Sequence, residues 1–378
     1  MSRRPTRDRD RDRLRYETAD DCAILVPDVN PMTQSAPEQS AARLRTRTVA
    51  DDPATGSWQE ALRNAIRTPR ELIEALELDP AWAPVMDGHD DDFPMLVPRS
   101  FAARMRKGDP HDPLLRQVLP DGAERITAPG FEADPLQEQR FARAGVVRKY
   151  SGRALLIASG ACPVHCRYCF RRNFPYADQL ASRQRWTGAV DALSADTQVT
   201  EVILSGGDPL TLTNEAIGEL IRAMENVASV QTLRFHTRFP IIIPERVDAG
   251  LVDTLAATRL RTVFVVHCNH ANEIDASVRR ALADLKAAGA QLLNQSVLLK
   301  GVNDNEDDLA ELSQRLFDAG VLPYYLHLLD PVAGAAHFDV APARGRALVA
   351  GLRRRLPGYL VPRLAREVPG ESSKTILA

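Results

Sequence analysis

The residues best suited to chemistry are three cysteines that lie close together. Cys162, Cys166 and Cys169 fall within eight residues, in the arrangement CxxxCxxC. Cysteine thiolates are the usual ligands of iron–sulfur clusters, and three on one loop can hold three irons of a four-iron cubane. The fourth iron then keeps an open coordination position, which a catalytic metal site requires. The spacing therefore predicts a catalytic 4Fe–4S cluster.

A structural zinc site is the alternative, because His165 lies inside the same loop. Structural zinc sites usually place their ligand pairs in two separated knuckles, so we favour the iron–sulfur interpretation. The two other cysteines, Cys22 and Cys268, stand alone. An odd cysteine count with one tight cluster does not fit a disulfide framework.

A second unusual segment is SGGDP at residues 205–209. Glycine gives the backbone freedom at a strand-to-helix turn, and aspartate caps helices. Considered alone, this segment is as consistent with a structural turn as with a ligand-binding one.

Both segments follow short apolar runs that are typical of β-strands. Six such runs occupy residues 154–158, 202–204, 232–235, 263–267, 292–299 and 324–329. The last five begin about 30 residues apart, which is the length of a strand–helix repeat. Helical patterns lie between them, for example at 216–224 and 276–288. This order predicts an α/β fold with a parallel sheet, either curved into a partial (β/α)6 barrel or open and doubly wound. In both architectures, chemistry belongs at the C-terminal ends of the strands.

The chain is expected to have three parts. Residues 1–55 are charged and polar, and we expect them to be disordered. Met32 within them is a candidate for the true start. Residues 56–150 contain two helix-start signals, beginning at Ser57 and Thr68, and then an irregular stretch. We expect a helical and irregular extension there that packs on a barrel formed by residues 151–378.

Composition excludes several classes of protein. The formal charge of −2, from 48 basic and 50 acidic residues, offers no basic field for nucleic acid. No apolar run approaches the ~20 residues of a membrane span, and the charged N-terminus lacks a secretory core. We therefore expect a cytoplasmic protein without a nucleic-acid or membrane partner.

Several motifs together resemble the radical S-adenosylmethionine (SAM) lysine 2,3-aminomutase family. The cysteine arrangement, with Tyr168 before the third cysteine, is the signature of radical SAM enzymes. The segments CRYCFRR, LSGGDPL, LLNQSVLLKGVND and PYYLHLLDPVAGAAHF are similar to the aminomutases. With GDPHDPLLRQVLP and KYSGRALLI upstream, the chain most resembles the branch that acts in β-lysylation of translation elongation factor P (the EpmB branch). The resemblance covers roughly residues 57 to 378 and implies a partial (β/α)6 radical-SAM barrel.

The resemblance also implies which residues hold the cofactors. The three cysteines would hold the cluster, and Gly206, Gly207 and Asp208 would bind SAM through exposed backbone groups and a negative charge. Lys374 matches the lysine that holds pyridoxal phosphate (PLP) as an imine, although Glu-Ser-Ser precedes it where the clostridial enzymes have glycines. The remaining cofactor contacts implied are Lys149, Tyr150, Arg153, Asn294, Gln295 and Ser296.

The resemblance implies a diamino acid substrate. Arg171 matches the arginine that clamps the substrate carboxylate, for which a planar guanidinium has bidentate geometry. Asp330 and Glu367 match two carboxylates that hold the distal ammonium, although the clostridial enzymes have Asp at the second position. For Asp330 alone, in a Leu-Leu-Asp-Pro sequence, turn initiation is the competing explanation.

The expected function is therefore conversion of L-α-lysine to β-lysine by an isomerase that uses the cluster, SAM and PLP. An external electron donor is implied, together with a functional link to elongation factor P and its lysyl ligase. Two alternatives remain open: an aminomutase for another amino acid such as arginine, and a non-catalytic iron–sulfur or zinc-binding barrel protein.

Overall fold

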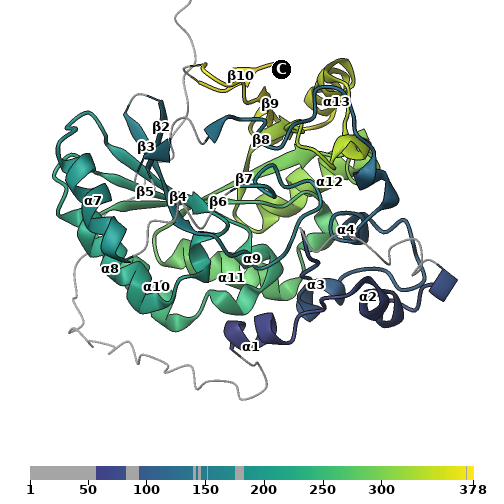
Figure 1. The fold of residues 1–378 in the computed structure, drawn as a ribbon, viewed down its shortest axis with the longest axis horizontal. Helices are drawn as coiled ribbons and strands as arrows, with labels where there is room; N and C mark the ends of the chain where they lie inside the picture. The colour runs from purple at the N-terminus through teal and green to yellow at the C-terminus, as the bar shows by residue number, and fades with distance from the viewer. Residues whose placement is uncertain are drawn as a thin grey trace, which may run out of the picture. The chain divides into compact units, whose positions relative to one another are not determined.

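The apolar runs of the sequence form one sheet whose strand order follows the chain (Figure 1). The computed structural model describes residues 57–81, 93–138, 142–143, 146–150, 152–174, 183–371 and 373–378, with backbone only at 142–143, 148–150 and 183–187. The strands are β1 (Ala142–Arg143), β2 (Val146–Tyr150), β3 (Arg153–Ser159), β4 (Glu201–Gly206), β5 (Thr232–Thr237), β6 (Arg261–Val266), β7 (Gln291–Leu298), β8 (Leu322–Leu328), β9 (Arg363–Arg366) and β10 (Thr375–Ile376).

The centre of the sheet is parallel. Strands β3 to β8 each pair in parallel with the next strand in the sequence, whereas β1 and β2 at one edge and β10 at the other pair antiparallel. A doubly wound sheet would reverse its strand order at a switch point, and this sheet does not. The predicted α/β partial barrel is thus confirmed, with the six predicted strands present and β9 added as a seventh parallel strand.

Helices connect the parallel strands and follow one another around the outside of the curved sheet (Figure 1). They are α7 (Arg183–Ser194), α8 (Asn214–Glu225), α10 (Ala249–Ala256), α11 (Ala276–Ala287), α12 (Glu306–Asp318) and α13 (Pro342–Arg355). A short helix, α9 (Phe239–Ile242), follows β5 directly. No helix in the described part of the chain is both long and apolar enough to cross a bilayer.

Alternation along the strands separates two environments. On β4 and β5, Leu204 and Phe235 are fully buried with the apolar side chains of the surrounding helices. Their neighbours Ser205 and His236 point to the opposite face and line a cavity. Since side chains alternate along a strand, β4 and β5 each contribute both to the core and to the cavity wall.

In its described residues, the segment before the barrel contains the short helices α1 (Trp58–Arg63), α2 (Pro69–Ala75), α3 (Arg99–Ala102) and α4 (Pro113–Arg116). Ser57 and Thr68 cap the first two, as predicted. Arg104, just after α3, donates hydrogen bonds to the carbonyls of Ile241 and Ile242, at the C-terminal side of β5. This segment therefore packs beside the strand ends where the candidate site lies. Residues Pro53–Ala378 form one compact unit. The predictions for residues 1–55, Met32 included, lie outside the described residues.

Candidate functional site

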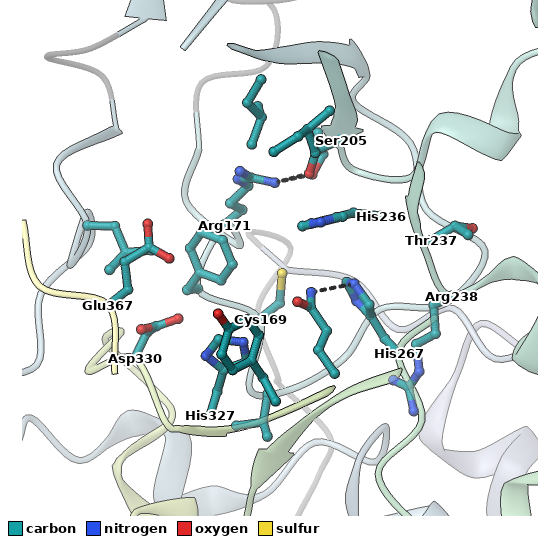
Figure 2. A pocket seen from close by; sticks show the side chains of 18 of the residues that line it. Cys169, Arg171, Ser205, His236, Thr237, Arg238, His267, His327, Asp330 and Glu367 are labelled. Carbon is teal, nitrogen blue, oxygen red and sulfur yellow. Dashed lines mark hydrogen bonds between the residues drawn. The ribbon is translucent and has the colours of Figure 1, made fainter. Parts of the chain in front are cut away.

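A cavity of about 410 Å³ lies on the concave side of the parallel strands (Figure 2). Its wall includes residues of β3, β4, β5, β7, β8 and β9, and residues of the loops that follow the parallel strands, such as His267 after β6. Cys162, Cys166, Cys169, Asp330 and Lys374, which are far apart in the sequence, all line it. Glu367 lines it as well, so the structure brings together the cysteines, the matched lysine and both matched acids.

The cysteine loop follows β3 directly. Its conformation is fixed by backbone hydrogen bonds, including Cys169 N–H to Cys166 O at 3.0 Å and Arg167 N–H to Gln117 O at 2.9 Å. Burial and the nearby Cys166 raise the pKa of Cys169 to about 11, and burial also raises the pKa of Cys162. Cysteine thiols release their protons when they ligate a metal, and three of them on one loop are suitable donors for a cluster.

His165 does not line the cavity that the three cysteines line, so the structure does not gather the four side chains as a structural zinc site would require. His165 Nδ1 lies 2.6 Å from Pro94 O, and its ring stacks on Phe93 at 5.3 Å between centroids. In the described part of the chain, no three His, Cys, Asp or Glu side chains meet closely enough to chelate a single ion. Thiolates around a four-iron cluster ligate separate irons and need not meet at one point.

The glycine segment passes very close to the cysteine loop. A Cβ atom at Gly206 would lie 2.2 Å from Ser159 O, and one at Gly207 would lie 2.3 Å from Ala161 O. Gly206 also has φ +124°, which favours glycine. Packing against the loop therefore requires both glycines, and it exposes their backbone at the cavity wall.

Asp208 lines the cavity, but its carboxylate is engaged by the protein. One oxygen accepts from Leu210 N–H at 3.0 Å and Thr237 Oγ1–H at 2.7 Å, and the other accepts from Arg238 N–H at 2.7 Å. Burial raises the pKa of Asp208 to about 6. These contacts connect the glycine segment to the end of β5, which gives Asp208 a positioning role.

Lys374 and the two predicted substrate carboxylates lie on one side of the cavity. Lys374 Nζ forms an ion pair with Glu367, and both side chains are more than three-quarters buried. Figure 2 shows the carboxylates of Glu367 and Asp330 near each other on this side. A lysine near the chain end would ordinarily be solvated. In this protein, β10 begins directly after Lys374 and pairs with β9, and this pairing holds Lys374 inside the cavity.

Arg171 is buried in the cavity wall, and its strongest partner was not foreseen. Its Nε and Nη2 donate to the two carboxylate oxygens of Glu138 at 2.7 and 3.0 Å, and Nη1 donates to Ser205 Oγ and Gly206 O at 2.9 and 3.0 Å. The bidentate edge predicted for the substrate is thus occupied by Glu138. No sequence signal pointed to Glu138, which lies in the stretch interpreted as irregular.

The predicted PLP-phosphate contacts are partly described. Arg153 lines the cavity, at the start of β3. The side chains of Lys149 and Tyr150 lie outside the described part of the structure. Arg234 and Arg363, which sequence reasoning did not single out, also line the cavity. Basic side chains therefore line the same cavity as Lys374, which fits an anionic cofactor that a lysine holds.

The prediction for residues 294–296 needs correction. Gln295 lines the cavity, and its Nε2 lies 2.7 Å from His267 Nε2. Asn294 and Ser296 point to the opposite face, where both bond to the backbone of Cys268. Their assignment as cofactor contacts is wrong, because the alternation of the strand turns them away from the cavity.

Three half-buried histidines complete the wall: His236, His267 and His327. Burial lowers the pKa of His267 and of His327 to about 3, and burial together with His267 lowers that of His236 strongly. His236 Nε2 is buried and has no hydrogen-bond partner among the described residues. These rings are neutral donors or acceptors, and the unpartnered nitrogen in the wall fits a cavity made for ligands.

Comparisons with known proteins agree with this geometry. A family model described as a 4Fe-4S single cluster domain matches residues 151–239, which include the cysteine loop and the glycine segment. The chain is 46% identical to L-lysine 2,3-aminomutase of Escherichia coli, over 86% of this chain and 95% of that protein.

Two further relatives carry the same name. The L-lysine 2,3-aminomutase of Haemophilus influenzae is 44% identical, over 85% of this chain and 96% of that protein. That of Clostridium subterminale is 32% identical, over 86% of this chain and 78% of that protein. The chain therefore belongs to the radical SAM lysine 2,3-aminomutase family.

Proposed function

We propose that this protein is an L-lysine 2,3-aminomutase, an isomerase that converts L-α-lysine to β-lysine. One observation carries the proposal: the three cysteines, Lys374 and the carboxylates of Asp330 and Glu367 line the same cavity. A radical centre, an amine-binding cofactor and an ammonium clamp must meet in this reaction. The cavity brings together residues suited to each.

The residues present fit the cofactors of the family. Cys162, Cys166 and Cys169 would hold the 4Fe–4S cluster, the backbone at Gly206 would contact SAM, and Lys374 would hold PLP. When bound, the cluster and SAM supply radical initiation, and PLP supplies a carbonyl that activates the α-amino group. The protein contributes orientation, charge and exclusion of water.

Charge at the two ends of the cavity would orient the lysine substrate. Glu367 already pairs with the ammonium of Lys374, which has the same alkylammonium chemistry as the substrate's distal end. With Asp330 beside it, this side of the cavity would hold the distal ammonium. Arg171 would attract the carboxylate, and Glu138 fixes its guanidinium against Ser205.

The biological setting is part of the proposal. The resemblance to the elongation factor P branch indicates that β-lysine is made for attachment to that factor by a separate ligase. An external reductant would supply the electron for the cluster. A cytoplasmic location would place the enzyme with the factor and in a reducing compartment.

The test is anaerobic incubation of reconstituted protein with SAM, a reductant and one amino acid at a time, followed by chromatography of the products. Lysine is expected to give β-lysine, whereas arginine and glutamate give no β-isomer. Two acids beside a glutamate side chain would repel it. Formation of β-arginine without β-lysine would refute the lysine assignment. Protein that binds zinc and no iron would refute the enzymatic one.

A further inference from the structure

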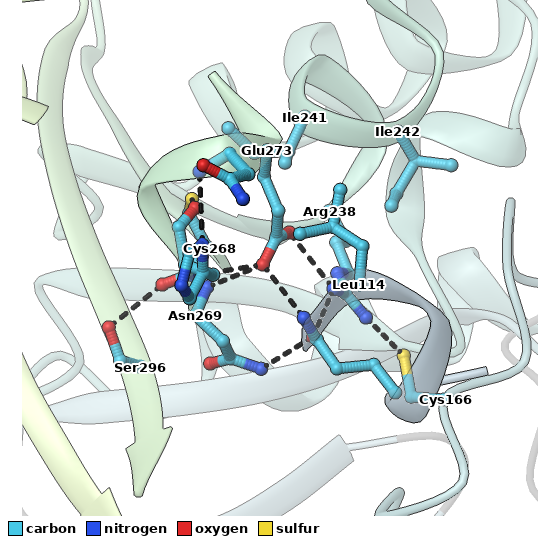
Figure 3. Close-up of polar contacts among 12 residues, drawn as sticks. Leu114, Cys166, Arg238, Ile241, Ile242, Cys268, Asn269, Glu273 and Ser296 are labelled. Atoms are coloured by element: carbon cyan, nitrogen blue, oxygen red, sulfur yellow. Dashed lines mark hydrogen bonds and ion pairs between the residues drawn. The ribbon is translucent and has the colours of Figure 1, made fainter. Parts of the chain in front are cut away.

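A buried cation contacts one of the proposed cluster ligands. Arg238 follows β5, and its side chain is 5% exposed. Its Nη1 donates to Cys166 Sγ at 2.7 Å (Figure 3). The backbone N–H of Arg238 also donates a hydrogen bond to Asp208 Oδ2, which fixes the backbone from which the guanidinium extends. Hydrogen bonds to ligating sulfurs are among the factors that set cluster potentials.

A carboxylate opposes this cation on its far side. Arg238 Nη2 donates to Glu273 Oε2 at 3.0 Å and to Gln117 Oε1 at 2.7 Å. Glu273 is fully buried, and its other oxygen accepts from the N–H groups of Asn269 and His270 at 2.9 and 3.0 Å. Figure 3 shows Arg238 between Cys166 and Glu273. The sulfur, the guanidinium and the carboxylate therefore form one fixed series of charges.

The guanidinium stays charged in this setting. Arginine remains protonated in proteins, and the Glu273 carboxylate lies 3.0 Å from Arg238 Nη2 as its counter-ion. Interactions between charges are strong in a buried site, where water screens them little. An electron added to a cluster beside Cys166 would be attracted by Arg238 and repelled by Glu273.

We propose that Arg238 raises the reduction potential of the cluster through its bond to Cys166, and that Glu273 limits the increase. The inference rests on the proposed function, because it requires Cys166 to ligate the cluster. Arg238 is a positioning and charge-setting residue here, and no contact with the substrate is assigned to it. The pair would keep the cluster reducible by a biological donor while leaving it a strong reductant.

The test is a redox titration of anaerobically reconstituted protein, followed by electron paramagnetic resonance without SAM or lysine. Arg238→Gln is expected to lower the equilibrium constant for one-electron reduction at least tenfold, which is about 59 mV. Arg238→Lys keeps the charge and is expected to recover at least half of that shift. Glu273→Gln is expected to shift the potential in the opposite direction, by a smaller factor, because the guanidinium lies between it and the sulfur.

A matched control separates charge from folding. Arg246 is fully buried, and its guanidinium bonds to Leu210 O, Asn214 Oδ1 and Leu212 O. Arg246→Gln removes a buried guanidinium from these partners and is expected to leave the potential of the assembled cluster unchanged.

These measurements test the proposal about the reduction potential separately from the proposed function. If Arg238→Gln has full iron and sulfide content and an unchanged reduction potential, the proposal is overturned. Normal β-lysine production by the same variant would leave the proposed function intact. If Arg238→Gln assembles no cluster, Glu273→Gln decides: a positive shift supports the proposal, and no shift or a negative one overturns it. Wild-type protein that holds no cluster would overturn both.

Discussion

Glu367 forms an ion pair with the ammonium of Lys374, in the part of the cavity where the proposed substrate would place an ammonium of its own. Asp330 lines the same side. Acids positioned this way can bind a diamino acid and discriminate against amino acids that carry no distal charge. We therefore propose that the choice of substrate depends on these two side chains.

Replacing Glu367 with glutamine is expected to raise KM for lysine at least tenfold. A hydrogen bond to a charged group contributes about 1.5–3 kcal/mol, and 1.4 kcal/mol corresponds to a factor of ten. Steady-state kinetics of Glu367→Gln measure this effect, with PLP content determined in parallel because Glu367 also contacts Lys374. Glu371→Gln, at an exposed acid nearby, is the control and should leave KM unchanged. Equal KM values in Glu367→Gln and wild type would contradict the clamp.

At the residue scale, site residues that belong to recognisable motifs could be predicted from the sequence. Residues that reach the site only through the tertiary fold could not. The cysteines and Lys374, which were selected from motifs, line one cavity. Glu138 did not stand out, because an acid in an aperiodic stretch shows no sign of the arginine it will meet. Asn294 and Gln295 looked equivalent in sequence, and only the phase of β7 separates a core residue from a cavity residue.

At the scale of elements, the end of β4 and the cysteine loop depend on each other. Gly207 N–H donates to Ser159 O at 2.7 Å, and Asp208 N–H donates to Ala161 O at 2.8 Å. No side chain fits between the two segments at Gly206 or Gly207. The position of the cluster ligands is therefore set by a strand that carries none of them.

Gly207→Ala is expected to displace the cysteine loop, since its Cβ would lie 2.3 Å from a backbone oxygen. We expect iron content after reconstitution to fall at least threefold, measured per folded protein. Gly188→Ala on α7 is the control, because a Cβ there meets nothing within 4 Å. Normal iron content in Gly207→Ala would show that the loop tolerates displacement and would contradict this account.

The C-terminal strand should control how firmly Lys374 is held. Leu377 N–H donates to Leu364 O at 2.8 Å, next to the β9–β10 pairing. Leu377→Pro removes this donor, so we expect at least a threefold loss of bound PLP, measured by cofactor absorbance after gel filtration. Leu377→Ala keeps the N–H and should retain more cofactor. Equal retention in the two variants would contradict a role for the strand pairing.

The elements themselves were largely predictable. The six predicted strands occur because each is a short apolar run between turn residues. Strand β9 was missed, because Arg363–Arg366 has two arginines in four residues and lacks such a run. Strand β10 has only two residues, and it exists because β9 supplies a partner, which local sequence cannot indicate.

At the scale of the whole molecule, the ionisable groups in the cavity wall affect the stability of the fold. The pKa values of His267 and His327 fall to about 3, so both rings are neutral when folded. In the unfolded chain they would titrate near 6.5. Below that pH the unfolded state binds more protons, so stability falls as pH decreases from about 6.5 toward 3.

Each of these histidines is expected to reduce the free energy of unfolding by about 1.4 kcal/mol between pH 7.5 and pH 5.5. Urea unfolding at both pH values should therefore show a smaller loss for His327→Gln than for wild type. His111→Gln, at an exposed histidine, is the control and should keep the wild-type loss. A wild-type pH dependence in His327→Gln would contradict the buried neutral state.

The most direct test of the central claim is β-lysine production by wild type and by Lys374→Ala, with Lys300→Ala as control. Lys300 is exposed, and Lys374 lines the cavity with the cysteines. The account predicts β-lysine from wild type and Lys300→Ala under anaerobic conditions with SAM and reductant, and at least a hundredfold less from Lys374→Ala. Normal production by Lys374→Ala, or none by wild type with a full cluster, would contradict it.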